Sequence, residues 1–181
     1  MRLRHMRTAL FTLAALLTLA ACGDDSPEVA DEPTTAPPSP GDCAGDDWVT
    51  VDTGKFSFRT PADLVDQEVQ GIDSLVGQFV GDTMTLGFDF GRFSGNTADQ
   101  FPDAREEVTI DGLTGDLIQI DVSADPNYGS ESDWMLSLYV AQPGGDDFGT
   151  SALALWVRYD DPAVGDVARC ITEKIDFADE A

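Results

Sequence analysis

Met84-Thr85-Leu86-Gly87-Phe88-Asp89-Phe90 is the stretch that decides the fold of this 181-residue chain. Its large apolar residues alternate with small or polar ones, which is the period of a strand that buries one face. The stretch therefore predicts a half-buried strand and makes a sheet the frame of the folded domain.

Similar runs on both sides of this strand predict further strands. We expect them at residues 48–51, 55–59, 64–69, 75–80, 108–110, 117–122, 134–141, 151–159 and 175–177. The Asp111-Gly112 step is typical of a hairpin turn, and residues 143–147 should turn between the two longest runs. Residues 91–103 read as a loop with a helical turn near Thr97.

One helix is expected close to the end of the chain. Asp161 suits an N-cap and Pro162 suits the first helical position. An apolar stripe follows at helical spacing, formed by Val164, Val167, Ala168 and Ile171. The predicted fold class is α+β, with a mostly antiparallel sheet of about 8–9 strands and the C-terminal helix packed on it.

The N-terminal segment has the composition of an export signal. Arg2, Arg4 and Arg7 precede an apolar run at residues 9–21, which is shorter than the roughly 20 residues of a bilayer span. The run closes on Leu19-Ala20-Ala21-Cys22, which resembles the lipobox of bacterial lipoproteins. An ordinary signal peptide with a chance cysteine and an uncleaved anchor are the alternatives.

The lipobox resemblance implies a division of the chain into three parts. Residues 1–21 would be removed as the signal peptide, and Cys22 would receive a diacylglyceryl thioether that anchors the protein in the cell envelope, facing the periplasm or the exterior. Residues 22–46 are acidic and proline-rich, which is typical of an extended tether. Residues 47–181 would form the single folded domain.

Charge and histidine content exclude several functions for the mature chain. Three of the ten basic residues leave with the signal and all 34 acidic residues stay, so its net charge is −27. Such a field repels nucleic acid. The only histidine, His5, also leaves, which excludes Ser-His-Asp and Cys-His catalysis and histidine-ligated zinc. The acidity itself suits either a saline habitat or an Asp-rich genome under selection for solubility.

Two cysteines remain besides Cys22. Cys43 and Cys170 lie at the start and end of the expected domain, and exported proteins with two spare cysteines usually pair them. We therefore expect a Cys43–Cys170 disulfide. Two free thiols or an intermolecular bond remain open.

Candidate ligand-binding residues lie at the ends of expected strands. Asp73, Ser74, Asp89 and Arg92 would form one cluster there, in which Arg92 offers a bidentate partner to a carboxylate. The simpler interpretation is that Asp73-Ser74 is a turn. The G-x-S-x-G spacing of a nucleophile elbow fails on both sides of Ser74.

A second candidate site is an acidic loop. Asp125, Asn127, Glu131 and Asp133 place oxygen donors at alternate positions, and calcium takes six to eight oxygen ligands. A solvated acidic loop without metal is the alternative. No other cofactor is expected.

Three further features of the folded part are Gly71-Ile72-Asp73-Ser74, Leu86-Gly87-Phe88-Asp89-Phe90-Gly91 and the helix that runs into Ile175-Asp176-Phe177. In these features the folded part resembles uncharacterised exported bacterial proteins and the PsbP/Mog1-like fold. The resemblance implies a binding or accessory role. The expected function is thus a membrane-anchored envelope lipoprotein that acts as a non-catalytic binding or accessory module; an envelope enzyme that uses carboxylates or a bound cation is the alternative.

Overall fold

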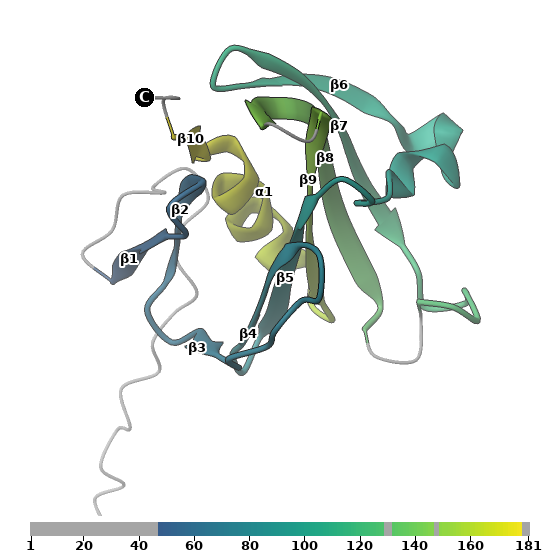
Figure 1. The fold of residues 1–181 in the computed structure, drawn as a ribbon. Helices are drawn as coiled ribbons and strands as arrows, with labels where there is room; N and C mark the ends of the chain where they lie inside the picture. Colours follow the sequence, from purple (N-terminus) through teal and green to yellow (C-terminus); the bar gives the residue numbers. More distant parts are fainter. Residues whose placement is uncertain (1–46, 129–131, 147–148, 179–181) are drawn as a thin grey trace, which may run out of the picture. The chain divides into compact units, whose positions relative to one another are not determined.

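The computed structural model describes residues 47–128, 132–146 and 149–178. All of them belong to the second of the two units into which the chain divides, Ala36–Ala181. The described residues form ten strands, three short 3-10 turns and one α-helix (Figure 1). The lipobox and Cys43 lie outside them.

The strands form two antiparallel sheets. The smaller sheet has the order β1-β2-β10, with β1 at Trp48–Asp52, β2 at Phe56–Pro61 and β10 at Asp176–Phe177. The larger sheet has the order β3-β4-β5-β9-β8-β7-β6. Its strands are β3 (Val65–Asp66), β4 (Leu75–Val80), β5 (Met84–Gly91), β6 (Glu106–Ile110), β7 (Leu113–Asp121), β8 (Trp134–Asp146) and β9 (Gly149–Tyr159).

The expectation of a mostly antiparallel α+β fold is confirmed, but the count of 8–9 strands in one sheet is wrong. Within the described residues there are ten strands, divided between two sheets. The expected strand at 64–69 is reduced to the two residues of β3. It ends there because Asp66 accepts a hydrogen bond from the backbone N–H of Glu68, whose φ of 50° lies in the left-handed region.

The Asp111-Gly112 hairpin is confirmed and is tighter than expected. Both residues have positive φ, 47° and 79°, as a two-residue type I′ turn requires. The pairing therefore resumes at once, with Ile110 opposite Leu113. For this reason β7 begins four residues before the expected strand.

The C-terminal helix is confirmed, with a 3-10 turn at its start. The turn η3 spans Pro162–Val164, and the carboxylate of its N-cap Asp161 accepts the N–H of Ala163 at 2.9 Å. Helix α1 follows at Gly165–Glu173. The predicted apolar stripe is buried from Val164 to Ile171. In the part of the chain that the structure describes, no helix is long and apolar enough to cross a bilayer.

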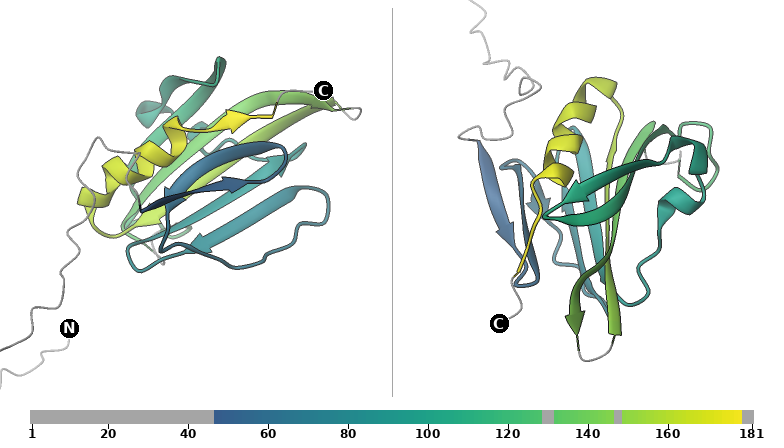
Figure 2. Two further views of the ribbon diagram at one scale, coloured as in Figure 1. Left: turned by 90° about the vertical axis from the view of Figure 1, so that its left-hand side faces the viewer. Right: turned by 90° about the horizontal axis from the view of Figure 1, so that it is seen from above.

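The main core lies between the two sheets. Helix α1 and the smaller sheet cover the same face of the larger sheet (Figures 1 and 2). Phenylalanines bridge the two layers: Phe56 of β2 meets Phe88 of β5 edge-on at 5.1 Å between ring centroids, and Phe58 meets Phe79 at 5.9 Å. The alternation that predicted β5 therefore points its large side chains into this core.

A smaller cluster lies on the other face of the larger sheet. The 3-10 turns η1 (Thr97–Asp99) and η2 (Pro102–Ala104) pack there against Ile118 of β7 and Met135 of β8. The expected helical turn near Thr97 is thus confirmed. It explains why β7 and β8 carry apolar residues on both faces.

Candidate functional site

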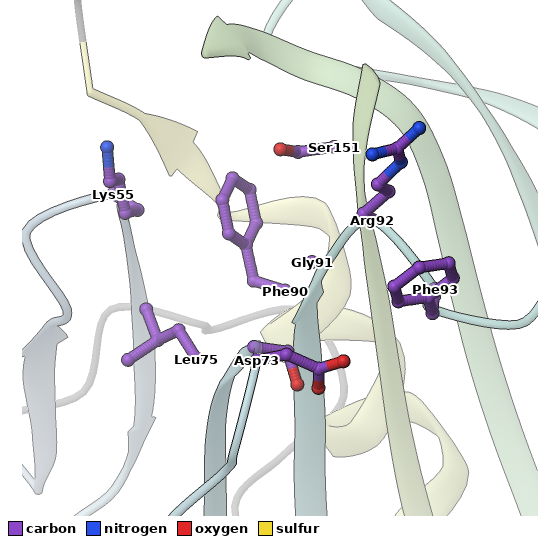
Figure 3. Close-up of a pocket in the computed structure, with 9 residues that line it drawn as sticks. Lys55, Asp73, Leu75, Phe90, Gly91, Arg92, Phe93 and Ser151 are labelled. Carbon is purple, nitrogen blue, oxygen red and sulfur yellow. The ribbon is translucent and has the colours of Figure 1, made fainter. Parts of the chain in front are cut away.

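A hollow of about 410 Å³ lies where the end of β5 meets the start of β4 (Figure 3). Its apolar lining comes from Leu75, Phe90 and Phe93. Its polar lining comes from Lys55, Asp73, Ser74, Arg92 and Ser151. The volume falls within the range of small-molecule sites. Lys55, Asp73, Arg92 and Phe93 are all exposed, so the hollow is open to solvent.

Two glycines allow the chain to form this hollow. Leu75 pairs with Phe90, which places Ser74 beside Gly91 at the end of the strand pair. A Cβ atom on Gly91 would lie 2.6 Å from Cβ of Ser74. A Cβ atom on Gly71 would lie 2.2 Å from the carbonyl oxygen of Ser74. Only residues without a side chain permit both approaches.

Lys55 reaches the hollow from the turn between β1 and β2. The hydroxyl of Thr53 donates to the carbonyl of Phe56 at 2.7 Å, and the N–H of Gly54 donates to Asp52 at 2.8 Å. The carbonyl of Lys55 accepts the N–H of Ala178 at 2.9 Å. The backbone of Lys55 is therefore held on both sides, while its side chain is exposed beside Phe90 (Figure 3).

Arg92 and Phe93 follow β5 and form another part of the rim. The guanidinium carbon of Arg92 lies 5.9 Å from the ring centroid of Phe93, within the range of a cation–π contact. Arg92 forms no ion pair with any residue that the structure describes. Phe93 is 78% exposed and Leu75 is 36% exposed, so the rim combines a cation with accessible apolar surface.

The structure brings together three of the four ligand-binding residues predicted from the sequence. Asp73, Ser74 and Arg92 line the hollow, and Asp89 does not. The carboxylate of Asp89 instead accepts the hydroxyl proton of Ser94 at 3.1 Å, and the same hydroxyl lies 3.0 Å from the Asp89 carbonyl. Asp89 therefore fixes the loop after β5 that carries Arg92 and Phe93.

Sequence reasoning missed the other lining residues. Lys55 had one available signal, because it is one of only two lysines in the mature chain. Phe90 was identified only as a strand residue. Ser151 comes from β9, the neighbour of β5 in the sheet, and no pattern in the sequence specifies that neighbour.

The predicted calcium loop joins β7 to β8 at the opposite end of the strands from the hollow, and it is described only in part. The carboxylate of Asp125 accepts the N–H of Asn127 at 2.7 Å, and Asp133 donates its N–H to Asp160 at 3.2 Å. Glu131 lies outside the described residues. Within the described ranges, no three His, Cys, Asp or Glu side chains gather as a metal site would need. Calcium binding stays a prediction.

The predicted disulfide is described at one end only. Cys170 lies on α1 and is buried, with 9% of its surface exposed. Its predicted partner, Cys43, lies outside the described residues, so the pairing stays a prediction.

Two titratable groups with shifted pKa values lie outside the hollow. Burial raises the pKa of Tyr159, which lies at the opposite end of β9 from Ser151, and the hydrogen bond from Gln119 lowers it. The side-chain and backbone hydrogen bonds from Ser123 lower the pKa of Asp121. Neither group contributes to the candidate site.

Comparisons with known proteins add little to this geometry. No protein-family model and no curated protein matches the chain. Among solved structures, a protein from Bacteroides thetaiotaomicron is similar with a TM-score of 0.46 and 14% sequence identity, over 74% of this chain and 49% of that chain. This chain thus spans about half the length of that protein. A likeness of this degree carries no argument about function.

Proposed function

We propose that the protein is a lipoprotein of the bacterial cell envelope, anchored through Cys22, whose folded domain binds a ligand in the hollow at the end of β5. The observation that supports binding is the composition of this hollow. It combines an apolar lining with two cationic side chains, Lys55 and Arg92, in a chain whose mature net charge is −27. Small-molecule sites are typically lined by apolar side chains together with a few polar groups that orient the ligand.

The proposed role is binding without catalysis. A nucleophile needs a base within hydrogen-bond reach, and the mature sequence contains no histidine to supply one. Ser74, the hydroxyl that the sequence placed in the ligand cluster, adjoins a glycine-dependent turn in which its carbonyl and Cβ approach Gly71 and Gly91. Its local setting is that of a turn residue at the edge of the hollow.

The anchor is supported by the sequence Leu19-Ala20-Ala21-Cys22 after a short apolar run. We also propose that the fold is of the PsbP/Mog1-like type, because an antiparallel sheet carries the C-terminal helix on one face. Both proposals fit an accessory protein that acts at a membrane surface.

Metabolic labelling with a palmitate analogue tests the anchor. Cells that produce the wild-type chain should incorporate the label into the protein, and cells that produce Cys22→Ser should not. Cys43→Ser is the matched control and should label like the wild type. Equal labelling of wild type and Cys22→Ser would refute lipidation at this cysteine.

A fragment screen by NMR tests the binding role. The mature chain with Cys22→Ser, labelled at its methyl groups, is mixed with small neutral, anionic and cationic fragments. At least one fragment should shift the methyl signals of Leu75, which lines the hollow. The methyl signals of Ile118, buried on the opposite face, should remain unchanged. A screen in which no fragment shifts Leu75 would refute the proposed binding site.

A further inference from the structure

We infer that the hollow selects a small organic carboxylate with a compact apolar body. This inference rests on the proposed function and specifies its ligand class. The carboxylate would lie against Arg92, with Lys55 on the other side of the hollow adding positive charge (Figure 3), and the apolar body would lie on Leu75, Phe90 and Phe93.

Most of the cationic side chains of the domain have partners within the protein. Seven lysine and arginine side chains lie in the described ranges. Arg105 pairs with Asp99 at 2.6 Å, Arg169 pairs with Glu106 at 3.1 Å, and Arg59 donates to the carbonyl of Trp48 at 3.1 Å. Arg158 also has an interaction partner.

The remaining three cations are Lys55, Arg92 and Lys174, and none of them forms an ion pair or hydrogen bond through its side chain with the described residues. Two of these three line the same hollow. The chain has 34 acidic residues, yet no described carboxylate forms an ion pair with any of the three. Two available cations at one site are therefore suited to an external anion.

Apolar side chains beside those cations are accessible to solvent. Phe93 is 78% exposed and Ile72, next to Asp73, is fully exposed. Phe90 is held between the layers by its contact with Phe56, whose ring centroid lies 5.7 Å away. Removing apolar surface from water is favourable, so this exposed surface next to a fixed aromatic ring favours contact with an apolar group. A purely inorganic anion would leave this surface uncovered.

The charges that line the hollow favour a ligand with a single negative charge. Among the described residues, Asp73 is the one carboxylate that lines the hollow, so their local sum of formal charges with Lys55 and Arg92 is positive by one. A single carboxylate neutralises that sum. A polyanion would meet the field of the strongly acidic domain and be repelled.

The experiment uses the mature Cys22→Ser chain and the probe 3-phenylpropionate, with the Leu75 methyl signals as the readout. Three comparisons define specificity: neutral 3-phenyl-1-propanol, inorganic phosphate, and 3-phenylpropionate at raised sodium chloride. We expect 3-phenylpropionate to bind more tightly than the alcohol or phosphate, and to weaken as salt screens the rim charges.

Three variants test whether the cationic side chains at the hollow bind the carboxylate. Arg92→Gln should raise the Kd for 3-phenylpropionate by roughly ten- to hundredfold, because a charge-assisted hydrogen bond is lost. Lys55→Gln should also raise the Kd. Lys174→Gln removes the same charge at the end of α1, outside the hollow, and should change the Kd by less than about twofold because of screening. All three replace exposed side chains, and equal melting temperatures would verify that they fold.

The outcomes separate this inference from the proposed function. If the alcohol binds at the hollow as tightly as the carboxylate, or if Arg92→Gln and Lys174→Gln have equal effects, the ligand class is wrong and the binding site stands. If phosphate binds as tightly as 3-phenylpropionate, the apolar part of the inference is wrong. If neither these probes nor the neutral and cationic fragments shift Leu75, both the inference and the binding role are refuted.

Discussion

Gly77→Ala tests how closely β4 and β5 are packed within the larger sheet. Gly77 of β4 lies opposite Phe88 of β5, and a Cβ atom on Gly77 would lie 2.3 Å from Cε1 and 2.5 Å from Cζ of that ring. Phe88 is 3% exposed. Its ring also meets Phe56 edge-on at 5.1 Å and Phe58 at 6.1 Å. The ring is therefore held by neighbours on the core side, and moving it away from a new methyl group would disturb these contacts.

The expected loss of stability follows from two opposing terms. Forcing an extra carbon into a packed core costs about 1–3 kcal/mol. Replacing glycine by alanine also reduces the conformational entropy of the unfolded chain, which returns about 0.4–1 kcal/mol. Central values leave a net loss of about 1.3 kcal/mol. With an unfolding entropy of about 2.1 cal/mol/K per residue over about 130 residues, this loss corresponds to a decrease in Tm of about 5 °C.

Gly95→Ala is the matched control. A Cβ atom on Gly95 would have no heavy atom within 4 Å, and its φ is not in the left-handed region. Only the entropic term applies there, so this variant should gain about 0.4–1 kcal/mol. Urea unfolding of both variants measures the difference directly.

A double variant tests whether the Phe88 ring causes the loss of stability in Gly77→Ala. Phe88→Leu removes the ring that the new methyl group would meet, so Gly77→Ala should cost less in that background than in the wild type. If Gly77→Ala is as stable as Gly95→Ala, the proposed contact between β4 and β5 is wrong. If Gly77→Ala lowers the free energy of unfolding equally in both backgrounds, its effect does not come from contact with the Phe88 ring.

Four further predictions concern the disulfide, the net charge, calcium and pH. Mass spectrometry of the unreduced mature chain should show the loss of two hydrogens expected for a Cys43–Cys170 bond, and two alkylatable thiols would contradict it. The Tm should rise between 0.1 and 1 M sodium chloride, because the Debye length falls from about 10 to about 3 Å and like charges cease to repel; a flat Tm would refute charge repulsion. If Asp125, Asn127, Glu131 and Asp133 bind calcium, millimolar calcium should add stability beyond sodium chloride of equal ionic strength. Because burial raises the pKa of Tyr159 above the ordinary value of 10.0, its stabilising contribution is complete below that pH and should fall as the pH rises further. The free energy of unfolding should decline less steeply above pH 10 in Tyr159→Phe, and identical slopes would exclude Tyr159 as the cause.

Local patterns predicted the central strands and the helix because each of these elements buries one face. Alternation in β5 and helical spacing from Val164 to Ile171 both reflect contact with the same core. The two shortest strands, β3 and β10, have two residues each and were predicted too long, at residues 64–69 and 175–177. A two-residue strand has no period that would fix its ends, and its length depends on the hydrogen-bond partners that a longer neighbour offers.

The division into two sheets depends on contacts between distant parts of the chain. β10 pairs with β2, with Phe177 opposite Phe56, so the end of the chain completes the sheet that its beginning started. Alternating residues show that a strand has a buried face, and they do not show which strand lies beside it. A sequence with ten strands therefore leaves the sheet assignment open.

The candidate site could likewise be predicted only in part, because its residues come from both sheets. Asp73, Ser74 and Arg92 could be grouped from the sequence because turns and strand ends place polar residues at the edges of a sheet. Lys55 could not be grouped with them, because it reaches the hollow through the β1–β2 turn of the other sheet. Asp89 shares the Gly91 face of β5 but does not line the hollow, because its carboxylate accepts the hydroxyl proton of Ser94 in the loop that follows. The site therefore depends on how the two sheets are layered, and its second cation can be assigned only once that layering is known.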